Sequence, residues 1–130
     1  MEWEAACRGR RARPYAYGWR FSAGRGNTLE TRIGGTTPEG LFANGATPEG
    51  VFDLSGNTWD WTSSIYANYP WHPDKSHEDP AAADGRKRVV RGGSWNNLHN
   101  YARAAYRNDL DPSYRYYDLG LRLVCESAPV

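Results

Sequence analysis

Glycine and proline recur along the whole chain, and this limits the fold to short regular elements separated by turns and loops. The 130 residues include 14 glycines and 8 prolines, which interrupt helices and strands and favour turns. Residues 9–48 sustain no helical period, so we expect ordered loop there, with short strands near residues 15–21. The length predicts one domain with one modest core.

Regular elements are expected in three places. Residues 2–8 place apolar side chains at i, i+3 and i+4 spacing, which predicts a short helix. Residues 89–91 begin a strand that ends at the following Gly-Gly pair, and residues 119–124 are typical of a closing strand. By the period of two, Cys125 should share the face of the leucines in this closing strand. The side chains expected in or near the core are Trp3, Trp59, Trp61, Trp95, Leu121 and Leu123.

The charge balance is nearly neutral, and it argues against two classes of partner, nucleic acids and anionic membranes. The formal net charge is +1, which gives no electrostatic reason to expect nucleic acid or an anionic membrane surface. No apolar run is long enough to cross a membrane. The first ten residues are charged and lack the apolar stretch of a signal peptide, so the localisation stays open.

The histidines and cysteines form no close-spaced metal motif. His72 and His77 lie in a polar segment, residues 66–87, and two nearby histidines can bind a metal ion. No third ligand follows at a fixed spacing, so a solvated loop is the favoured interpretation. Cys7 and Cys125 stand near opposite ends of the chain. They are interpreted as two small buried apolar residues, and the sequence does not decide whether they pair.

Four blocks together resemble one known family. They are EWEAACRG at residues 2–9, GVFDLSGNTWDW at 50–61, RVVRGGSW at 88–95 and LGLR at 119–122. Their order and rough spacing are similar to the formylglycine-generating-enzyme (sulfatase-modifying factor) family. The resemblance implies an α+β, C-type-lectin-like fold that is loop-rich, with short antiparallel strands and few helices. It also implies that residues 1–130 form a single domain in which the N-terminal part of the family domain is absent or trimmed.

The resemblance argues against an enzyme. Oxidase members of the family use two cysteines in the segment after the RGGS block, because thiolates are the ligands that copper(I) prefers. Here residues 95–103 contain no cysteine. A sulfoxide-forming branch holds a histidine-ligated iron mainly through an extra domain, and His99 alone is not such a site. Cys7 and Cys125 match positions near a structural disulfide of some members, so a disulfide between them is possible.

Calcium is the one cofactor that the resemblance leaves open. Members that bind calcium ligate it around the GNxWEW block, through a carboxylate and nearby main-chain carbonyls. The matching positions here are Asp53, Gly56, Thr58 and Asp60. Oxygen ligands on a loop suit calcium. The alternative is that Asp60 accepts hydrogen bonds from backbone amides and holds no ion.

The segment between the last two blocks suggests a function. Arg103, Arg107, Pro112 and Arg115 belong to a framework that we expect to stay fixed on the scaffold. The positions outside the framework carry residue types reachable from an AAY asparagine codon by changing adenines alone. Lys, Glu, Gln, Met and Trp are not reachable in this way, and none of them occurs in residues 96–118. This pattern resembles the variable region of diversity-generating-retroelement variable proteins. The expected variable positions are Asn97, Leu98, His99, Asn100, Tyr101, Tyr106, Asn108, Asp109, Leu110, Asp111, Ser113, Tyr114, Tyr116, Tyr117 and Asp118.

A ligand-binding surface is the function that this segment favours. Five of the nine tyrosines lie in it, and tyrosine provides large contact area at low entropic cost, as in antibody loops. The expected partner is a protein or a cell-surface ligand, with no nucleic acid and no membrane insertion. The alternatives are an oxidase of the parent family and a fixed, non-catalytic structural or binding domain.

Overall fold

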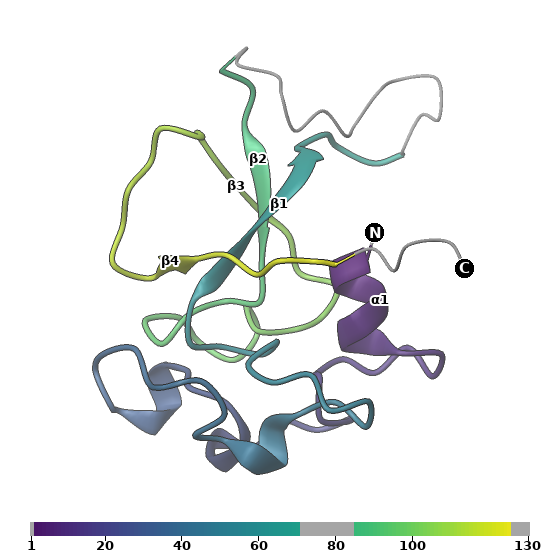
Figure 1. Cartoon of the computed structure of the whole chain (residues 1–130), viewed down its shortest axis with the longest axis vertical. Coiled ribbons are helices and arrows are strands. Elements are labelled where there is room, and N and C mark those ends of the chain that lie inside the picture. The colour runs from purple at the N-terminus through teal and green to yellow at the C-terminus, as the bar shows by residue number, and fades with distance from the viewer. Residues whose placement is uncertain (1, 71–84, 126–130) are drawn as a thin grey trace.

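The structure is a computed structural model that describes residues 2–70 and 85–125. Its regular elements are short and are separated by long ordered loops (Figure 1). In chain order they are the α-helix α1 (Glu2–Arg8), the 3-10 helices η1 (Ala23–Arg25), η2 (Leu29–Thr31) and η3 (Ala43–Gly45), and the strands β1 (Trp59–Ile65), β2 (Arg88–Arg91), β3 (Asn108–Leu110) and β4 (Leu119–Gly120).

Helix α1 forms at the predicted residues. Glu4 in its first turn and Arg8 in its last suit the helix dipole, and they form an i, i+4 ion pair of 2.6 Å. The inner face of the helix buries Cys7, and Trp3 packs beside it. In residues 15–21, where short strands were expected, an isolated bridge joins Tyr15 to Gly18.

Four strands form one sheet in the order β3-β2-β1-β4. β1 pairs with β2, and β2 with β3, in the antiparallel sense that the resemblance implied. β4 differs, because it runs parallel to β1, with Trp59 opposite Leu119. The loop-rich α+β fold is therefore confirmed, with one parallel edge that the sequence did not predict.

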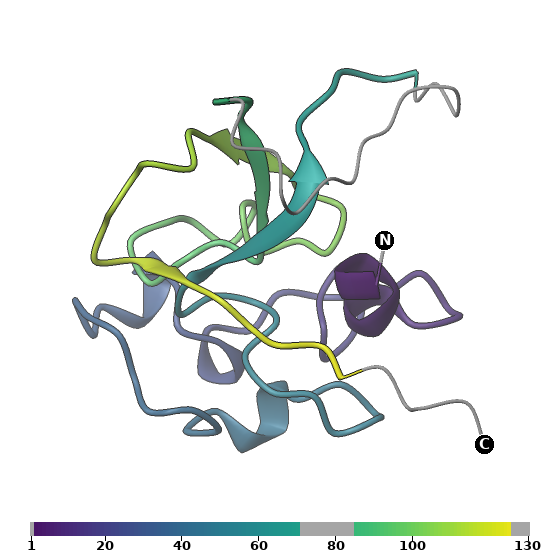
Figure 2. The same ribbon diagram turned by 45° about the horizontal axis from the view of Figure 1, so that its top comes forward.

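The predicted closing strand is cut short at Gly120, and its inward face was assigned wrongly. Leu121 is 70% exposed and Leu123 is 87% exposed. Between them, Arg122 donates from Nε to Oδ2 of Asp60 at 3.0 Å. Val124 is 62% exposed as well, so the described segment beyond Gly120 has no buried face, and it is held to the interior through Arg122. Both views show this segment running back toward α1 (Figures 1 and 2).

The apolar core is small and is built from small side chains. Cys7, Ala16, Leu54 and Ala104 form a fully buried cluster, against which Trp3 and Val51 pack. Of the tryptophans expected in or near the core, Trp59 is buried, whereas Trp3, Trp61 and Trp95 are half-buried. Alanine and cysteine let the backbones of separate loops approach closely, so much of the interior is backbone that needs polar partners.

The GNTW block provides several of those polar partners. Asn57 accepts the Thr37 backbone N–H at Oδ1 (2.9 Å) and donates from Nδ2 to the Thr37 carbonyl (3.1 Å). Gly56 beside it has φ +102°, and a Cβ there would lie 2.4 Å from the carbonyl oxygen of Asn27. Only glycine fits this position without strain. In the described residues, no helix has the length and apolar character to cross a membrane.

Candidate functional site: a tyrosine-rich surface on a backbone-anchored segment

The expected variable segment leaves the sheet after β2 and returns to it twice. Gly93, with φ +68°, makes the first turn, where a Cβ would lie 3.0 Å from the backbone nitrogen of Ala102. The segment then pairs through β3 and enters β4. Figure 1 shows the residues between β3 and β4 as a yellow-green loop that projects away from the sheet. Rigid strands therefore hold both ends of an exposed loop.

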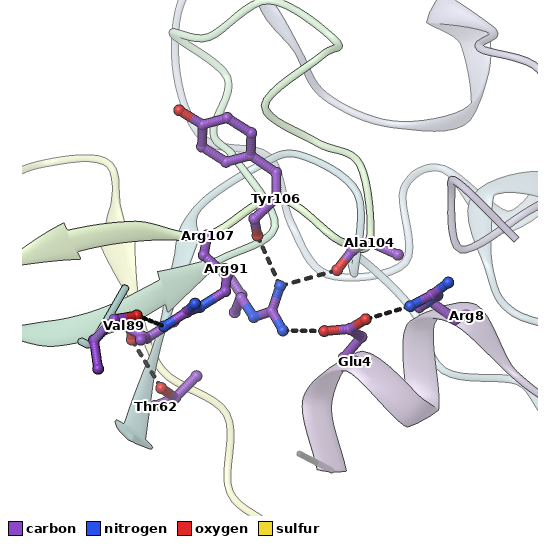
Figure 3. A network of polar contacts seen from close by, with 9 residues as sticks. Glu4, Arg8, Thr62, Val89, Arg91, Ala104, Tyr106 and Arg107 are labelled. Atoms are coloured by element: carbon purple, nitrogen blue, oxygen red, sulfur yellow. Dashed lines mark hydrogen bonds and ion pairs between the residues drawn. The ribbon is translucent and has the colours of Figure 1, made fainter. Parts of the chain in front are cut away.

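The Arg91 side chain anchors the middle of this segment by binding backbone atoms of the segment (Figure 3). Its guanidinium is buried and donates to the carbonyl oxygens of Ala104 (3.1 Å) and Tyr106 (2.9 Å). The same group forms an ion pair with Glu4, which also contacts Arg8. Burial raises the pKa of Glu4, but the hydrogen bonds from Arg8 and Arg91 outweigh it, so the pKa is lowered overall. Helix α1 is thereby tied to backbone atoms of the segment and not to its side chains.

Ser94 of the RGGSW block anchors the two ends of the segment. Its hydroxyl is fully buried and lies within hydrogen-bond distance of Oδ1 of Asn97 (2.7 Å) and of Oδ2 of Asp118 (2.8 Å), either of which can accept its single proton. Asp118 is buried and its carbonyl accepts the backbone N–H of Trp59. The expectation that Asp118 lies on the displayed surface is wrong, because its carboxylate completes this internal network. Asn97 is half-buried and supports the same network.

The loop before β4 carries a row of aromatic side chains in contact with one another. Tyr114, Tyr116 and Tyr117 are 49%, 52% and 63% exposed. Ring centroids lie 5.7 Å apart between Tyr114 and Tyr116, 4.7 Å between Tyr116 and Tyr117, and 5.7 Å between Tyr117 and the half-buried Trp95. We call these four residues the aromatic row. These ring contacts restrict the motion of the exposed side chains.

A second tyrosine pair sits nearer the sheet. Tyr101 and Tyr106 meet edge to face at 4.9 Å, and both contact Trp59 from strand β1. Both tyrosines are half-buried. They therefore join the displayed segment to the scaffold while keeping part of each ring accessible.

His99 makes tertiary contacts that sequence reasoning missed. Its backbone N–H and its Nδ1 both lie within hydrogen-bond distance of Oε1 of Glu30, at 3.0 and 2.7 Å. Its ring stacks on Phe21 at 4.4 Å. Burial raises the pKa of Glu30, but hydrogen bonds from the backbone and ring of His99, from Thr28 and from the backbone of Glu30 itself outweigh burial and lower the pKa to about 2. Glu30 lies in η2 and Phe21 in the preceding loop, and neither belongs to a recognisable motif, so the sequence offered no signal for them.

The remaining expected positions differ in exposure. Leu98 and Asn100 are exposed, as are Asp111 and Ser113, which hydrogen-bond each other in a turn. The β3 residues Asn108, Asp109 and Leu110 are half-buried by strand pairing. Asp109 forms an ion pair of 2.6 Å with Lys87. The expected positions thus form two tyrosine clusters joined by loop and strand residues.

The framework arginines differ in how they contact the scaffold. Arg107 donates to the carbonyl of Ala67 at 3.1 Å, which matches the expected fixing role. Arg103 and Arg115 are exposed and donate to carbonyls within their own segment, at Asn100 and at Pro112 and Tyr114. Those two arginines shape the loop locally, and they do not pack into the scaffold beneath it.

The two cysteines are free thiols. Cys7 is fully buried, lies 3.8 Å from the carbonyl oxygen of Leu54, and has a pKa that burial raises to about 12. Cys125 is exposed on the outward-facing C-terminal segment. The structure does not contain the possible disulfide, and the interpretation of both cysteines as buried is wrong for Cys125, because Cys7 is buried in the core whereas Cys125 is exposed. A buried thiol of such high pKa is a poor nucleophile and a poor metal ligand.

The residues proposed to hold calcium are engaged by donors of the chain itself. Oδ2 of Asp60 accepts from Nε1 of Trp3 (2.8 Å) and from Arg122 (3.0 Å). Oδ2 of Asp53 accepts from the backbone N–H of Gly40 at 2.8 Å. A guanidinium directly on the carboxylate does not fit a divalent cation, so we assign Asp60 a structural role. Its donors are side chains, not the backbone amides named in the alternative.

Metal-binding side chains do not gather elsewhere in the part of the chain that the structure describes. No group of three or more His, Cys, Asp or Glu residues converges there. His72 and His77 lie outside the described residues.

Comparisons with known proteins agree with this geometry. The model of the sulfatase-modifying factor enzyme 1-like domain matches residues 1–127. Hercynine oxygenase from Mycolicibacterium thermoresistibile is 32% identical over 138 residues, covering 95% of this chain and 30% of that protein. Inactive C-alpha-formylglycine-generating enzyme 2 from Mus musculus is 31% identical over 136 residues, covering 93% of this chain and 40% of that protein.

A solved structure matches at similar coverage. Treponema denticola variable protein 1 superposes with a TM-score of 0.76 at 25% identity, over 92% of this chain and 43% of that one. The chain therefore spans less than half the length of each of these three proteins. Its relatives include an enzyme, a protein named as inactive and a variable protein. The match along residues 1–127 shows that the chain belongs to the sulfatase-modifying factor enzyme 1-like family.

Proposed function

We propose that this chain is a non-catalytic, ligand-binding variable protein that displays a diversified surface on the family scaffold. The observation that carries the proposal is the aromatic row, whose tyrosines are exposed, contact one another and lie among residue types reachable from adenine changes alone. The similarity to Treponema denticola variable protein 1 supports it. We propose a protein or cell-surface partner, and neither nucleic acid nor membrane insertion.

The anchoring of the segment supports substitution of its side chains. Arg91 binds the carbonyl oxygens of Ala104 and Tyr106, and Ala104 N–H donates to the carbonyl of Pro14. Backbone atoms are the same whatever side chain follows, so these bonds survive changes at the displayed positions. The fully buried Ala102 and Ala104 belong to the fixed framework. Asp118 is left out of the proposed surface because it is buried.

An oxidase of the parent family is the competing function, since hercynine oxygenase is among the relatives. Residues 95–118 contain no cysteine, and the only cysteine in the core is a buried thiol of raised pKa. We therefore expect no oxygen consumption above background when the chain is incubated with a cysteine-containing peptide, with or without added copper. Turnover proportional to protein concentration would refute the non-catalytic proposal.

Sequencing of the coding region across a population of the source organism tests the variable surface directly. We expect substitutions to concentrate at the displayed positions of residues 97–117, confined to adenines, while the framework stays constant at Arg103, Arg107, Pro112 and Arg115. Residues 27–45, which are also largely exposed loop, provide the matched control. Equal variation in the two stretches, or none in either, would leave a fixed binding or structural domain as the better function.

A further inference from the structure

A pocket lies beside the Tyr101–Tyr106 pair, at the edge of the proposed surface. It encloses about 490 Å³. Three separate parts of the chain meet in it: the end of α1 with the loop that follows, the segment after β1, and residues 103–107 of the displayed segment. The side chains that matter here are Arg8, Arg13, Tyr66, Tyr69, Arg103 and Arg107.

The pocket wall is strongly basic, although the whole chain is nearly neutral. Four arginines line it, and the described residues that line it include no aspartate or glutamate. Arg8 pairs with Glu4, and Arg13 with the exposed Glu49 at 3.4 Å. Among the described residues, Arg103 and Arg107 hydrogen-bond only to carbonyl oxygens and meet no carboxylate. Within residues 2–70 and 85–125, two formal positive charges therefore face the pocket region without a carboxylate partner.

Two of these arginines are held in place before any ligand binds. Arg107 lies over the rings of Tyr66 and Tyr69, 5.0 and 4.9 Å from their centroids, and donates to the Ala67 carbonyl. The side chain of Arg13 is only 9% exposed, and its buried Nε has no hydrogen-bond partner. A guanidinium fixed by stacking and by burial loses little entropy when it binds an anion, and a nearby low-dielectric wall strengthens the attraction.

We propose that this pocket binds a carboxylate side chain of a protein ligand, as a constant anionic anchor beside a changing tyrosine surface. The pocket volume accommodates an acidic side chain, and the guanidinium fork matches a carboxylate in geometry. Arg103 and Arg107 belong to the fixed framework, whereas the adjoining Tyr106 belongs to the displayed positions. The inference deepens the proposed function by naming a chemical group on the ligand, and rests on that function for the claim that the ligand is a protein.

Nuclear magnetic resonance of arginine side chains tests the pocket. The 130-residue chain is titrated with a blocked tetraglutamate peptide, with a blocked tetraglutamine peptide and with inorganic phosphate, and the Nε–Hε signals are followed. We expect saturable shifts at Arg103 and Arg107 with tetraglutamate alone. Arg107→Gln should weaken binding roughly tenfold, as expected for the loss of a charge-assisted hydrogen bond. Arg103→Gln, at an exposed side chain, provides a second variant that does not disturb the Tyr66 and Tyr69 stack.

The control is Arg32→Gln, which removes the same charge from an exposed residue outside the pocket. Saturation that is unchanged by Arg32→Gln and weakened by both pocket variants supports the proposal. Absence of saturation, or equal weakening by all three variants, would overturn the pocket. Tighter binding of inorganic phosphate than of tetraglutamate would overturn the carboxylate assignment. Population sequencing is independent of these titrations, so failure of the pocket and failure of the diversified surface can be told apart.

Discussion

Replacing Arg91 with methionine should destabilise the domain more than any other single change to a charged residue discussed above. The substitution removes two hydrogen bonds to buried carbonyls and one partner of Glu4 (Figure 3). Each lost bond to a charged donor costs about 1 to 2 kcal/mol. Glu4 retains Arg8 and is partly exposed, so its loss is smaller. We expect the free energy of unfolding to fall by about 3 to 4 kcal/mol, within the 3 to 5 typical for breaking a buried pair.

Thermal and urea unfolding measure this loss. For a domain of this size, roughly 4 °C of melting temperature corresponds to each kcal/mol, so Arg91→Met should lower Tm by about 12 to 16 °C. Glu4→Gln keeps the carbonyl bonds and should cost only about 1 to 2 kcal/mol. Amide hydrogen exchange should show that Ala104, whose N–H donates to the Pro14 carbonyl, loses protection in the methionine variant.

Arg115→Met is the matched control. Arg115 is exposed and donates only to carbonyls of its own loop, so we expect a change below about 0.5 kcal/mol. An Arg91→Met variant as stable as Arg115→Met would refute the assignment of Arg91 as the backbone anchor. A loss from Glu4→Gln equal to that from Arg91→Met would show that the ion pair, and not the carbonyl bonds, holds the segment.

Three further measurements follow from the structure. The pKa of Glu30 is lowered to about 2 from 4.5, so the hydrogen bonds that its carboxylate accepts stabilise the fold above about pH 4.5 and lose their effect as the pH falls toward 2. The parent chain should therefore be about 1 to 2 kcal/mol more stable than Glu30→Gln above pH 4.5, and this difference should fall toward zero near pH 2. A difference that stays constant with pH in unfolding experiments would contradict this. Gly56→Ala should cost about 3 kcal/mol or more in urea unfolding because of its positive φ and its close backbone contact, whereas Gly24→Ala, with open space around it, should cost less than about 1 kcal/mol. Addition of a calcium chelator should leave Tm unchanged within about 1 °C, because the Asp60 carboxylate already accepts hydrogen bonds from Trp3 and Arg122. A fall in Tm of several degrees would show that calcium binds the folded chain after all.

Much of the fold was predictable because its blocks carry local signals. The helical spacing of residues 2–8 and the glycines that follow β2 each specify conformation within a few residues. The tyrosine-rich positions were also identified from their residue types and their framework. These signals do not depend on distant parts of the chain, so the sequence alone reveals them.

The errors share one cause, which is that the deciding contact is far away in sequence. Leu121 and Leu123 fit an inward face by period two, but the strand ends at Gly120, and the segment is held instead by the salt bridge from Arg122 to Asp60. Asp118 belongs to the same set of residue types as the displayed positions, and its burial and its bond to Ser94 show that it is internal. Neither contact is visible in the local pattern of residue types.

The sequence by itself determined the family blocks, the short elements and the set of residues available for display. Only the tertiary structure decided which of those residues form the aromatic row, which hydrogen-bond to Ser94 inside the protein, and which arginines line a pocket. Glu30, Phe21 and Arg13 entered the site without any motif, because their positions depend on loops that the small core brings together. Local sequence encodes conformation and residue chemistry, whereas convergence of side chains from separate loops is a property of packing.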